Sequence, residues 1–265
     1  MSSGTTSVTA SGFETVSVDA GGGTDVINVT ESAVGVPINV IDSTGFDSLN
    51  VNVDNVGSAE ARFSTSMNFG PVVVGNGGFA NMLTNGTRVM YMTTVAVTPG
   101  GRVDLNDNDA IVDYTGVSTL AAVQALLNTG RGAGTWPAAG ITSTAAKNNA
   151  LHNTTLGAIE STDFKSVFGA GAPFDGVTID TTAVLIKYTY YGDTDFNGVV
   201  NFDDYSRTDA GFNSGSSGWF RGDFDGNGIV NFDDYSLIDL AFNTQGPALV
   251  GFRPGAGKAG GLRSL

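Results

Sequence analysis

The sequence contains Asp193-Thr-Asp-Phe-Asn-Gly-Val-Val-Asn-Phe-Asp-Asp204 and, thirty residues later, Asp223-Phe-Asp-Gly-Asn-Gly-Ile-Val-Asn-Phe-Asp-Asp234. Each copy continues as Tyr-Ser-x-x-Asp-x-x-Phe-Asn, so the two units end at Asn213 and Asn243. Oxygen-bearing side chains recur at every second position in the first half of each window, and a glycine lies in the middle. A repeat this regular predicts two copies of one structural unit in tandem.

Alternating oxygen donors are the pattern with which a short loop wraps a calcium ion. Ca²⁺ takes about 6–8 oxygen ligands at roughly 2.3–2.6 Å, and a twelve-residue loop supplies them from alternate positions. The sequence therefore predicts two Ca²⁺ ions, each held by five side chains and one main-chain carbonyl, with the ninth residue acting directly or through water. The expected ligands are Asp193, Asp195, Asn197, the Val199 carbonyl, Asn201 and Asp204 in the first loop, and Asp223, Asp225, Asn227, the Ile229 carbonyl, Asn231 and Asp234 in the second.

Each loop leads into a predicted helix. Tyr205, Thr208 and Phe212 are spaced i, i+3 and i+7, and the second unit repeats this spacing, so each helix has one face for its partner. Gly198 and Gly228 lie where the loop turns sharply. Val200 and Val230 follow the carbonyl ligands, and we expect them to join the loops in a short β contact.

This loop–helix repeat resembles the dockerin type I repeat, whose members carry two calcium loops, each followed by a helix. Aspartate at the closing position of both loops is part of the resemblance, which covers about 50 of the 265 residues. It implies the ligand roles named above and a cohesin-like partner protein. Phe202-Asp203 and Phe232-Asp233 depart from the small or hydroxylated residues that cellulosomal dockerins often carry there. The two phenylalanines could serve another partner or pack inward against the β domain, and we favour inward packing.

Composition excludes several other classes of protein. The formal net charge is −14, so the chain lacks the basic surface that nucleic acid requires. Ten of the 22 aspartates lie between Asp193 and Asp239, which concentrates the acidity in the repeat. Cysteine is absent, which removes disulfides and thiolate metal sites, and no apolar run is long enough to span a membrane. Catalysis is not expected, since the single histidine, His152, has no nucleophile motif around it.

The N-terminal region repeats a smaller unit. Apolar–polar–apolar triplets recur at steps of 11 residues, separated by turns such as Gly12-Phe-Glu14, Gly23-Thr-Asp25 and Gly45-Phe-Asp47. Regular short strands with turn signals predict a β-solenoid or a closely stacked β-sandwich, and we favour the solenoid. The triplets are Val16-Ser-Val18, Ile27-Asn-Val29, Ile38-Asn-Val40 and Leu49-Asn-Val51. The segment Ala20–Asn28 also resembles one calcium-binding nonapeptide of the RTX type, although a tight turn is the simpler interpretation.

The middle of the chain carries mixed signals. Asn85-Gly86 between apolar runs predicts a two-residue hairpin. A helix is expected from Ser118 to about Gly130, and residues 131–160 are expected to be loop with a short helix near Ser143–Asn149. The strand Ala183–Tyr190 runs directly into the acidic repeat, so we expect the repeat to be docked on the β domain rather than tethered to it.

Four regions follow from these patterns. Residues 1–114 are expected to be a β-rich, solenoidal region, 115–191 a mixed capping segment, 192–246 the dockerin-like module and 247–265 a flexible Gly-rich tail. The fold class expected is mainly β, with a β-solenoid followed by a small α-helical paired calcium-loop module. Similar organisation occurs in the C-terminal parts of large bacterial secreted surface proteins with repetitive β stalks.

The function expected is that of a noncatalytic extracellular or cell-surface protein, a component of a surface layer, fibre or adhesin that assembles with itself. One alternative is a cohesin-docking module of a secreted polysaccharide-degrading assembly. The other is a carbohydrate-binding protein, which would need exposed aromatic residues; Trp136 and Trp219 are the two tryptophans.

Overall fold

The computed structural model describes residues 16–30, 36–41 and 45–249. It is mainly β, with 31% strand against 25% helix, and its strands form a β-solenoid-like arrangement, as the sequence predicts. The expected turn Gly12-Phe-Glu14 and most of the expected tail, residues 247–265, lie outside the described residues. Within the described ranges, no helix combines the length and apolar character needed to cross a bilayer.

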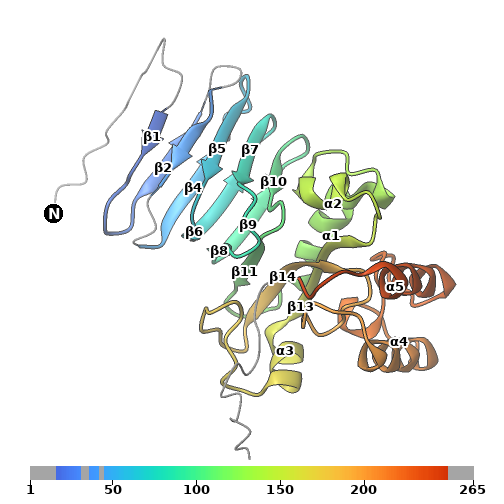
Figure 1. Ribbon diagram of the computed structural model, residues 1–265. Helices are drawn as coiled ribbons and strands as arrows, with labels where there is room; N and C mark the ends of the chain where they lie inside the picture. Colours follow the sequence, from blue (N-terminus) through green and yellow to red (C-terminus); the bar gives the residue numbers. More distant parts are fainter. Residues whose placement is uncertain (1–15, 31–35, 42–44, 250–265) are drawn as a thin grey trace, which may run out of the picture.

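Fourteen strands and five helices make up the described fold (Figure 1). The strands are β1 Val16–Val18, β2 Val26–Val29, β3 Ile38–Val40, β4 Asp47–Val51, β5 Ala59–Phe63, β6 Met67–Val74, β7 Gly78–Met82, β8 Val89–Met92, β9 Thr94–Val97, β10 Arg102–Asp104, β11 Asp109–Asp113, β12 Gly140–Thr142, β13 Thr154–Glu160 and β14 Ala183–Tyr190. The helices are α1 Leu120–Arg131, α2 Thr144–Asn148, α3 Ser161–Phe168, α4 Phe202–Ser214 and α5 Phe232–Thr244.

The solenoid has two sheets, and the strands from β1 to β8 alternate between them. One sheet runs β1-β3-β5-β7-β10-β12, and the other runs β13-β14-β11-β8-β6-β4-β2, with β9 also paired to β6. Val16 lies opposite Ile38 and Val26 lies opposite Ser48, so one coil of the N-terminal part contains 22 residues. The 11-residue step in the sequence is therefore half a coil, and neighbouring triplets belong to opposite sheets.

Because the strands pair in parallel register, equivalent residues of successive coils stack in columns through the core. Val29, Val51, Val74 and Val97 lie opposite one another in successive strands. Such columns bury apolar surface continuously along the solenoid, so each coil is stabilised by its neighbours.

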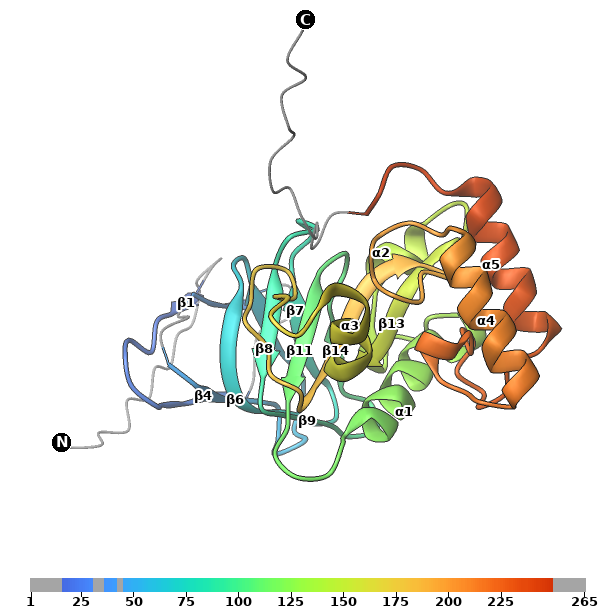
Figure 2. The ribbon, with the colours of Figure 1, turned by 90° about the horizontal axis from the view of Figure 1, so that it is seen from below.

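The C-terminal end of this core is closed by a different arrangement. The apolar stripe of α1, which includes Val123 and Leu127, packs on the solenoid core. Strand β14 pairs antiparallel with β11, and β13 pairs antiparallel with β14. These two pairs end the run of parallel pairs in that sheet. These elements lie between the solenoid and the helix pair α4–α5 in both views (Figures 1 and 2).

Three local predictions need correction. Asn85-Gly86 does not form a hairpin, because β7 and β8 belong to different sheets and the turn carries the chain from one sheet to the other. Residues 131–160 are not mainly loop: they contain β12 and all of β13 in addition to the expected short helix α2. Helix α1 extends past Gly130 and ends at Arg131, with Gly132 as its left-handed C-cap. Glycine is required at position 130 because a Cβ there would lie 1.7 Å from the Ile141 carbonyl oxygen.

Candidate metal centre

The two loop–helix units fold alike from their shared sequence. Each helix begins with a reciprocal capping box, in which an asparagine side chain caps the helix and the closing aspartate reaches back to the asparagine backbone. Asp204 Oδ2 accepts from the Asn201 backbone N–H at 2.8 Å, and Asp234 Oδ2 accepts from Asn231 at 2.9 Å. These bonds fix the two closing aspartates where each loop meets its helix.

Each loop brings three carboxylates together. Oxygen atoms of Asp193, Asp195 and Asp204 lie within 4.8 Å of one another, and all three residues are buried. Asp223, Asp225 and Asp234 form the matching cluster in the second loop at the same limit of 4.8 Å, with Asp225 partly exposed. Six of the twelve ligands expected from the sequence are thus gathered into two compact sites.

The amide ligands expected from the sequence lie in the same loops but are engaged in local turns. Asn197 Oδ1 accepts from the Val199 backbone N–H at 2.9 Å. Asn201 Oδ1 accepts from the Asp203 backbone N–H at 2.7 Å, so the ninth residue acts as the helix cap. The second loop repeats both contacts, with Asn227 bonded to Ile229 at 2.9 Å and Asn231 to Asp233 at 2.6 Å.

Burial makes ionisation of these carboxyl groups unfavourable. It raises the pKa of Asp193 well above its usual range, and the nearby Asp204 charge adds to the effect. Burial raises the pKa of Asp204 to about 6. It also raises the pKa values of Asp223 and Asp234. Three acids crowded into a buried loop fit a site built for a cation, since a divalent ion there would offset the repulsion that otherwise favours protonation.

The two loops differ in how their charge is balanced. Arg207 Nη1 lies 3.1 Å from Asp195 Oδ2 and 3.7 Å from Asp204 Oδ1. Leu237 occupies the equivalent position of the second unit. In the described part of the chain, no ion pair forms at the second cluster, so its three carboxylates have no cationic side chain to compensate them.

One buried carboxylate oxygen in the second loop fits the role of a metal ligand. Asp223 is 5% exposed, and its Oδ1 has no hydrogen-bond donor among the described residues. Buried carboxylate oxygens are almost always hydrogen-bonded or bound to a metal. The donor set of both loops consists of oxygen alone, and the chain has no cysteine, which suits a hard cation such as Ca²⁺ rather than a thiophilic metal.

The loop backbone confirms one expectation and corrects another. Gly198 and Gly228 have φ of +86° and +90°, the left-handed conformation that favours glycine. The expected β contact between Val200 and Val230 is absent from the described structure. Instead, the Gln245 side chain binds both backbone groups of Val200, accepting from its N–H and donating to its carbonyl at 2.8 Å each.

The helices pack through their predicted faces in a reciprocal way. The Tyr205 hydroxyl of α4 donates to Asp239 of α5 at 2.6 Å, and the Tyr235 hydroxyl of α5 donates to Asp209 of α4. Equivalent residues thus exchange equivalent bonds, which gives the helix pair an approximate two-fold symmetry.

The expected inward packing of Phe202 and Phe232 is wrong. Both rings are 78% exposed, each resting against a phenylalanine of the other helix at centroid distances of 6.1 and 6.0 Å. The first residue of each helix therefore lies at the surface, and other elements of the module contact the rest of the chain.

Those other elements are the Trp219 turn and the second loop. Trp219 is buried, and its Nε1 donates to the Asp193 carbonyl at 2.7 Å. Its ring covers Gly157 of β13 so closely that a Cβ there would lie 2.5 Å from it. The module is therefore docked on the β region, as the absence of a linker predicts.

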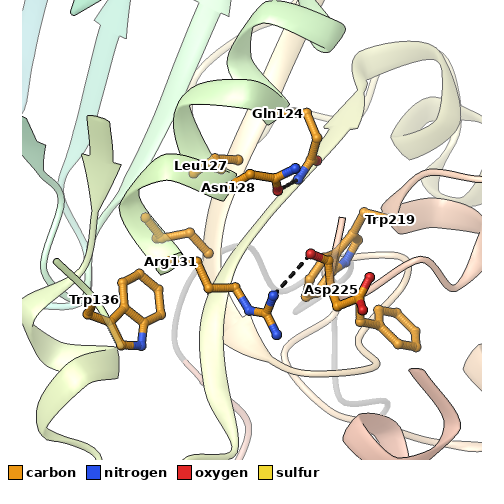
Figure 3. A pocket seen from close by; sticks show the side chains of 9 residues that line it. Gln124, Leu127, Asn128, Arg131, Trp136, Trp219 and Asp225 are labelled. Carbon is orange, nitrogen blue, oxygen red and sulfur yellow. Dashed lines mark hydrogen bonds between the residues drawn. The ribbon is translucent and has the colours of Figure 1, made fainter. Parts of the chain in front are cut away.

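Helix α1 also holds the second loop, a role that the sequence alone does not reveal. Figure 3 shows Arg131 reaching across a small pocket to the main-chain oxygen of Asp225, at 3.0 Å. Asn128 donates to the Gly226 carbonyl at 2.7 Å. These side chains fix the turn that contains Asp225, the second aspartate expected to be a ligand in this loop. They lie almost one hundred residues away from it in sequence.

Comparison with known proteins identifies no relative of this chain. Scans against protein-family models, curated proteins and solved structures each returned no match.

Proposed function

We propose that residues 192–246 form a dockerin-like module that binds two Ca²⁺ ions, one in each acidic loop. The observation that supports this most directly is the pair of buried three-aspartate clusters in matched positions. The ions would be held by the six clustered carboxylates, with the asparagine side chains and the Val199 and Ile229 carbonyls completing the oxygen shell.

Calcium in this proposal serves the fold of the module. Without a cation, each loop holds three acids whose mutual repulsion opposes closure around the site. An ion that binds only the folded loops stabilises them by mass action. Isothermal titration calorimetry on the intact chain tests this proposal: the expected result is uptake of two Ca²⁺ ions, and no heat of binding would refute it.

We propose further that the whole chain is a noncatalytic structural protein that works outside the cell, as part of a surface layer, fibre or adhesin. A solenoid with a calcium-dependent module at one end suits a compartment with millimolar calcium, where the sites would stay filled. Strands β1 and β2 end the two sheets in the described part of the chain, and their unpaired edges are surfaces on which another chain can pair.

Self-assembly is tested by size-exclusion chromatography and electron microscopy with and without calcium. Ordered oligomers or arrays in calcium are the expected result. A protein that remains strictly monomeric at high concentration in calcium would contradict the assembly function while leaving the calcium sites intact.

The exposed helix face supports a second candidate, in which the module docks on a cohesin-like partner. Phe202 and Phe232 are exposed at equivalent positions of the two helices, and large exposed aromatic residues are common at protein interfaces. A binding assay against cohesin domains tests this function, with Phe202→Ser and Phe232→Ser as variants that should lose binding without losing calcium. Carbohydrate binding gains no such support, because both tryptophans are buried.

A further inference from the structure

A lysine and two aspartates form a buried cluster between the solenoid and the metal module. Lys187 of β14 has a side chain that is 1% exposed, and its Nζ lies 2.8 Å from Asp109 Oδ2. The same Nζ lies 3.3 Å from both side-chain oxygens of Asp175. The Asp109 and Asp175 side chains are 3% and 4% exposed, so all three groups are removed from water.

The fold holds the reacting groups in register. Ala110 of β11 lies opposite Ile186 of β14 in an antiparallel pair, which places the preceding Asp109 opposite Lys187. The Tyr188 backbone N–H donates to Asp109 Oδ1 at 2.8 Å and leaves Oδ2 facing the amine. The carboxyl group is thereby anchored on one side and paired with the amine on the other.

The turn at Asp175 and the Phe174 ring lie against the cluster, whose three side chains are buried from water. Asp175 lies in the turn closed by the reciprocal backbone bonds of Phe174 and Val177, with a φ of +46°. The Phe174 ring is fully buried and lies 5.3 Å from the lysine Nζ. Amide formation releases water, so a dry site favours the bond over its hydrolysis.

Burial and the neighbouring charges set the protonation of Asp109 and Lys187. Burial raises the pKa of Asp109 well above its usual range, and the Asp175 charge raises it further although Lys187 opposes this. Burial lowers the pKa of Lys187, but the Asp109 and Asp175 charges outweigh that effect and raise it. Lys187 is therefore held as an ammonium, so condensation needs a neighbouring base. The Asp175 carboxyl oxygens, 3.3 Å from Nζ, are placed to accept its proton.

We propose that Lys187 and Asp109 condense into an intramolecular amide bond, with Asp175 as the acid–base group. Asp175 accepts a proton from the ammonium, and the neutral amine attacks the Asp109 carboxyl carbon. The bond from that carbon to one hydroxyl oxygen breaks, one water leaves, and the C–N bond forms. A carboxylic acid, an ammonium and a carboxylate are thereby converted into an amide, water and a protonated Asp175, without any oxidant or cofactor.

The amide bond would link the solenoid covalently to the strand that leads into the acidic loops. Strand β11 belongs to the last coils of the solenoid, and β14 leads directly into the first acidic loop. A direct link between these strands transmits tension from the solenoid to the module without unfolding the segment between them. Formation of the bond requires the fold but not calcium, so its test is independent of the metal sites.

Intact-mass spectrometry of the denatured full-length protein is the decisive experiment. The expected mass is lower than that of the sequence by one water. Trypsin should then yield a branched peptide in which Val103–Arg131 is joined to Ser166–Arg207, because an acylated Lys187 is no longer cleaved. Folded wild-type protein at its full sequence mass, with cleavage after Lys187, would overturn the proposal.

Two variants define the chemistry. Lys187→Met should restore the full mass; a persistent loss of water in it would assign the loss to a succinimide at an Asp-Gly pair and refute the amide bond. Asp175→Asn keeps both reacting groups and should slow condensation by about 10²–10⁴-fold, the usual contribution of general acid–base catalysis. Condensation at the wild-type rate in Asp175→Asn would remove that residue from the mechanism. Retention of the branched peptide after hydroxylamine treatment, which opens succinimides, completes the assignment.

Discussion

Removing calcium from the module should lower the stability of the protein by several kcal/mol. Two unit charges 4.8 Å apart, the upper limit for the carboxylate oxygens in each loop, repel by about 3 kcal/mol at an effective dielectric constant of ~20. Each loop contains three such pairs, and among the described residues only the first cluster forms an ion pair with a cationic side chain, Arg207. Closed, fully ionised loops therefore need the divalent ion.

The magnitude follows from mass action. Calcium at about 100 times its dissociation constant stabilises the folded state by about 2.7 kcal/mol at each independent site, and so by about 5 kcal/mol for two. For a protein of this size that corresponds to a rise in Tm of roughly 10–20 °C. Circular dichroism and Trp219 fluorescence should report the change together, because the indole donates to the Asp193 carbonyl in the first loop.

A matched pair of variants separates a metal effect from general helix destabilisation. Asp234→Asn removes a clustered carboxylate, whereas Asp233→Asn makes the same chemical change one residue earlier, on an exposed side chain in the same first helical turn. Asp234→Asn should remove one site and about half of the calcium-induced stabilisation, and Asp233→Asn should remove neither. Equal effects of the two variants, or a melting temperature that chelation leaves unchanged, would refute the reasoning.

Three further predictions follow from particular contacts. Arg207→Leu should strengthen calcium binding at the first loop several-fold, because the guanidinium competes with the ion for the carboxylates; calorimetry should show the other site unchanged. The metal-free protein should lose stability as pH rises, because burial raises the pKa of Asp204 from an ordinary 3.8 to about 6. Protonated Asp204 favours the folded state, so this stabilisation is fully present below about pH 3.8 and is lost as the pH rises through about 6. Urea unfolding in a chelator should show this fall, and saturating calcium, which requires the ionised form, should reverse it above pH 6. Gly157→Ala should destabilise the docked module by about 1–3 kcal/mol through overpacking against Trp219, measured against Gly171→Ala, where a Cβ meets nothing within 4 Å.

The sequence predicts those features that depend on local repeats. The 11-residue triplets locate β1 to β4, and the solenoid follows because short strands at regular spacing can bury their apolar side only by stacking. The glycine and capping residues of the acidic loops likewise act within a few positions of the structure they specify. Local rules therefore indicated the positions of α4 and α5 and the three clustered carboxylates of each loop.

Features that depend on partners distant in sequence were missed or predicted wrongly. Asn85-Gly86 looks like a hairpin because a dipeptide does not show whether the next strand joins the same sheet. The alternation that marks a half-exposed strand is absent from β13, which is buried along almost its whole length. Phe202 and Phe232 were expected inside because they are large and apolar, yet the docking contact is made by Trp219 instead.

The buried lysine cluster is the clearest case of a feature that local sequence patterns do not predict. In Ala183–Tyr190, Lys187 looks like an ordinary polar residue on the outward face of a strand, and Asp109 looks like one of several acids in a polar turn. Only the register of β11 against β14, with the turn at Asp175 folded over them, shows that the three groups share one dry site. A buried ion pair generally stabilises a fold less than apolar residues of similar volume would. A cluster with one ammonium and two carboxyl groups is therefore poorly explained by stability alone, and a covalent product gives a physical reason for placing them together.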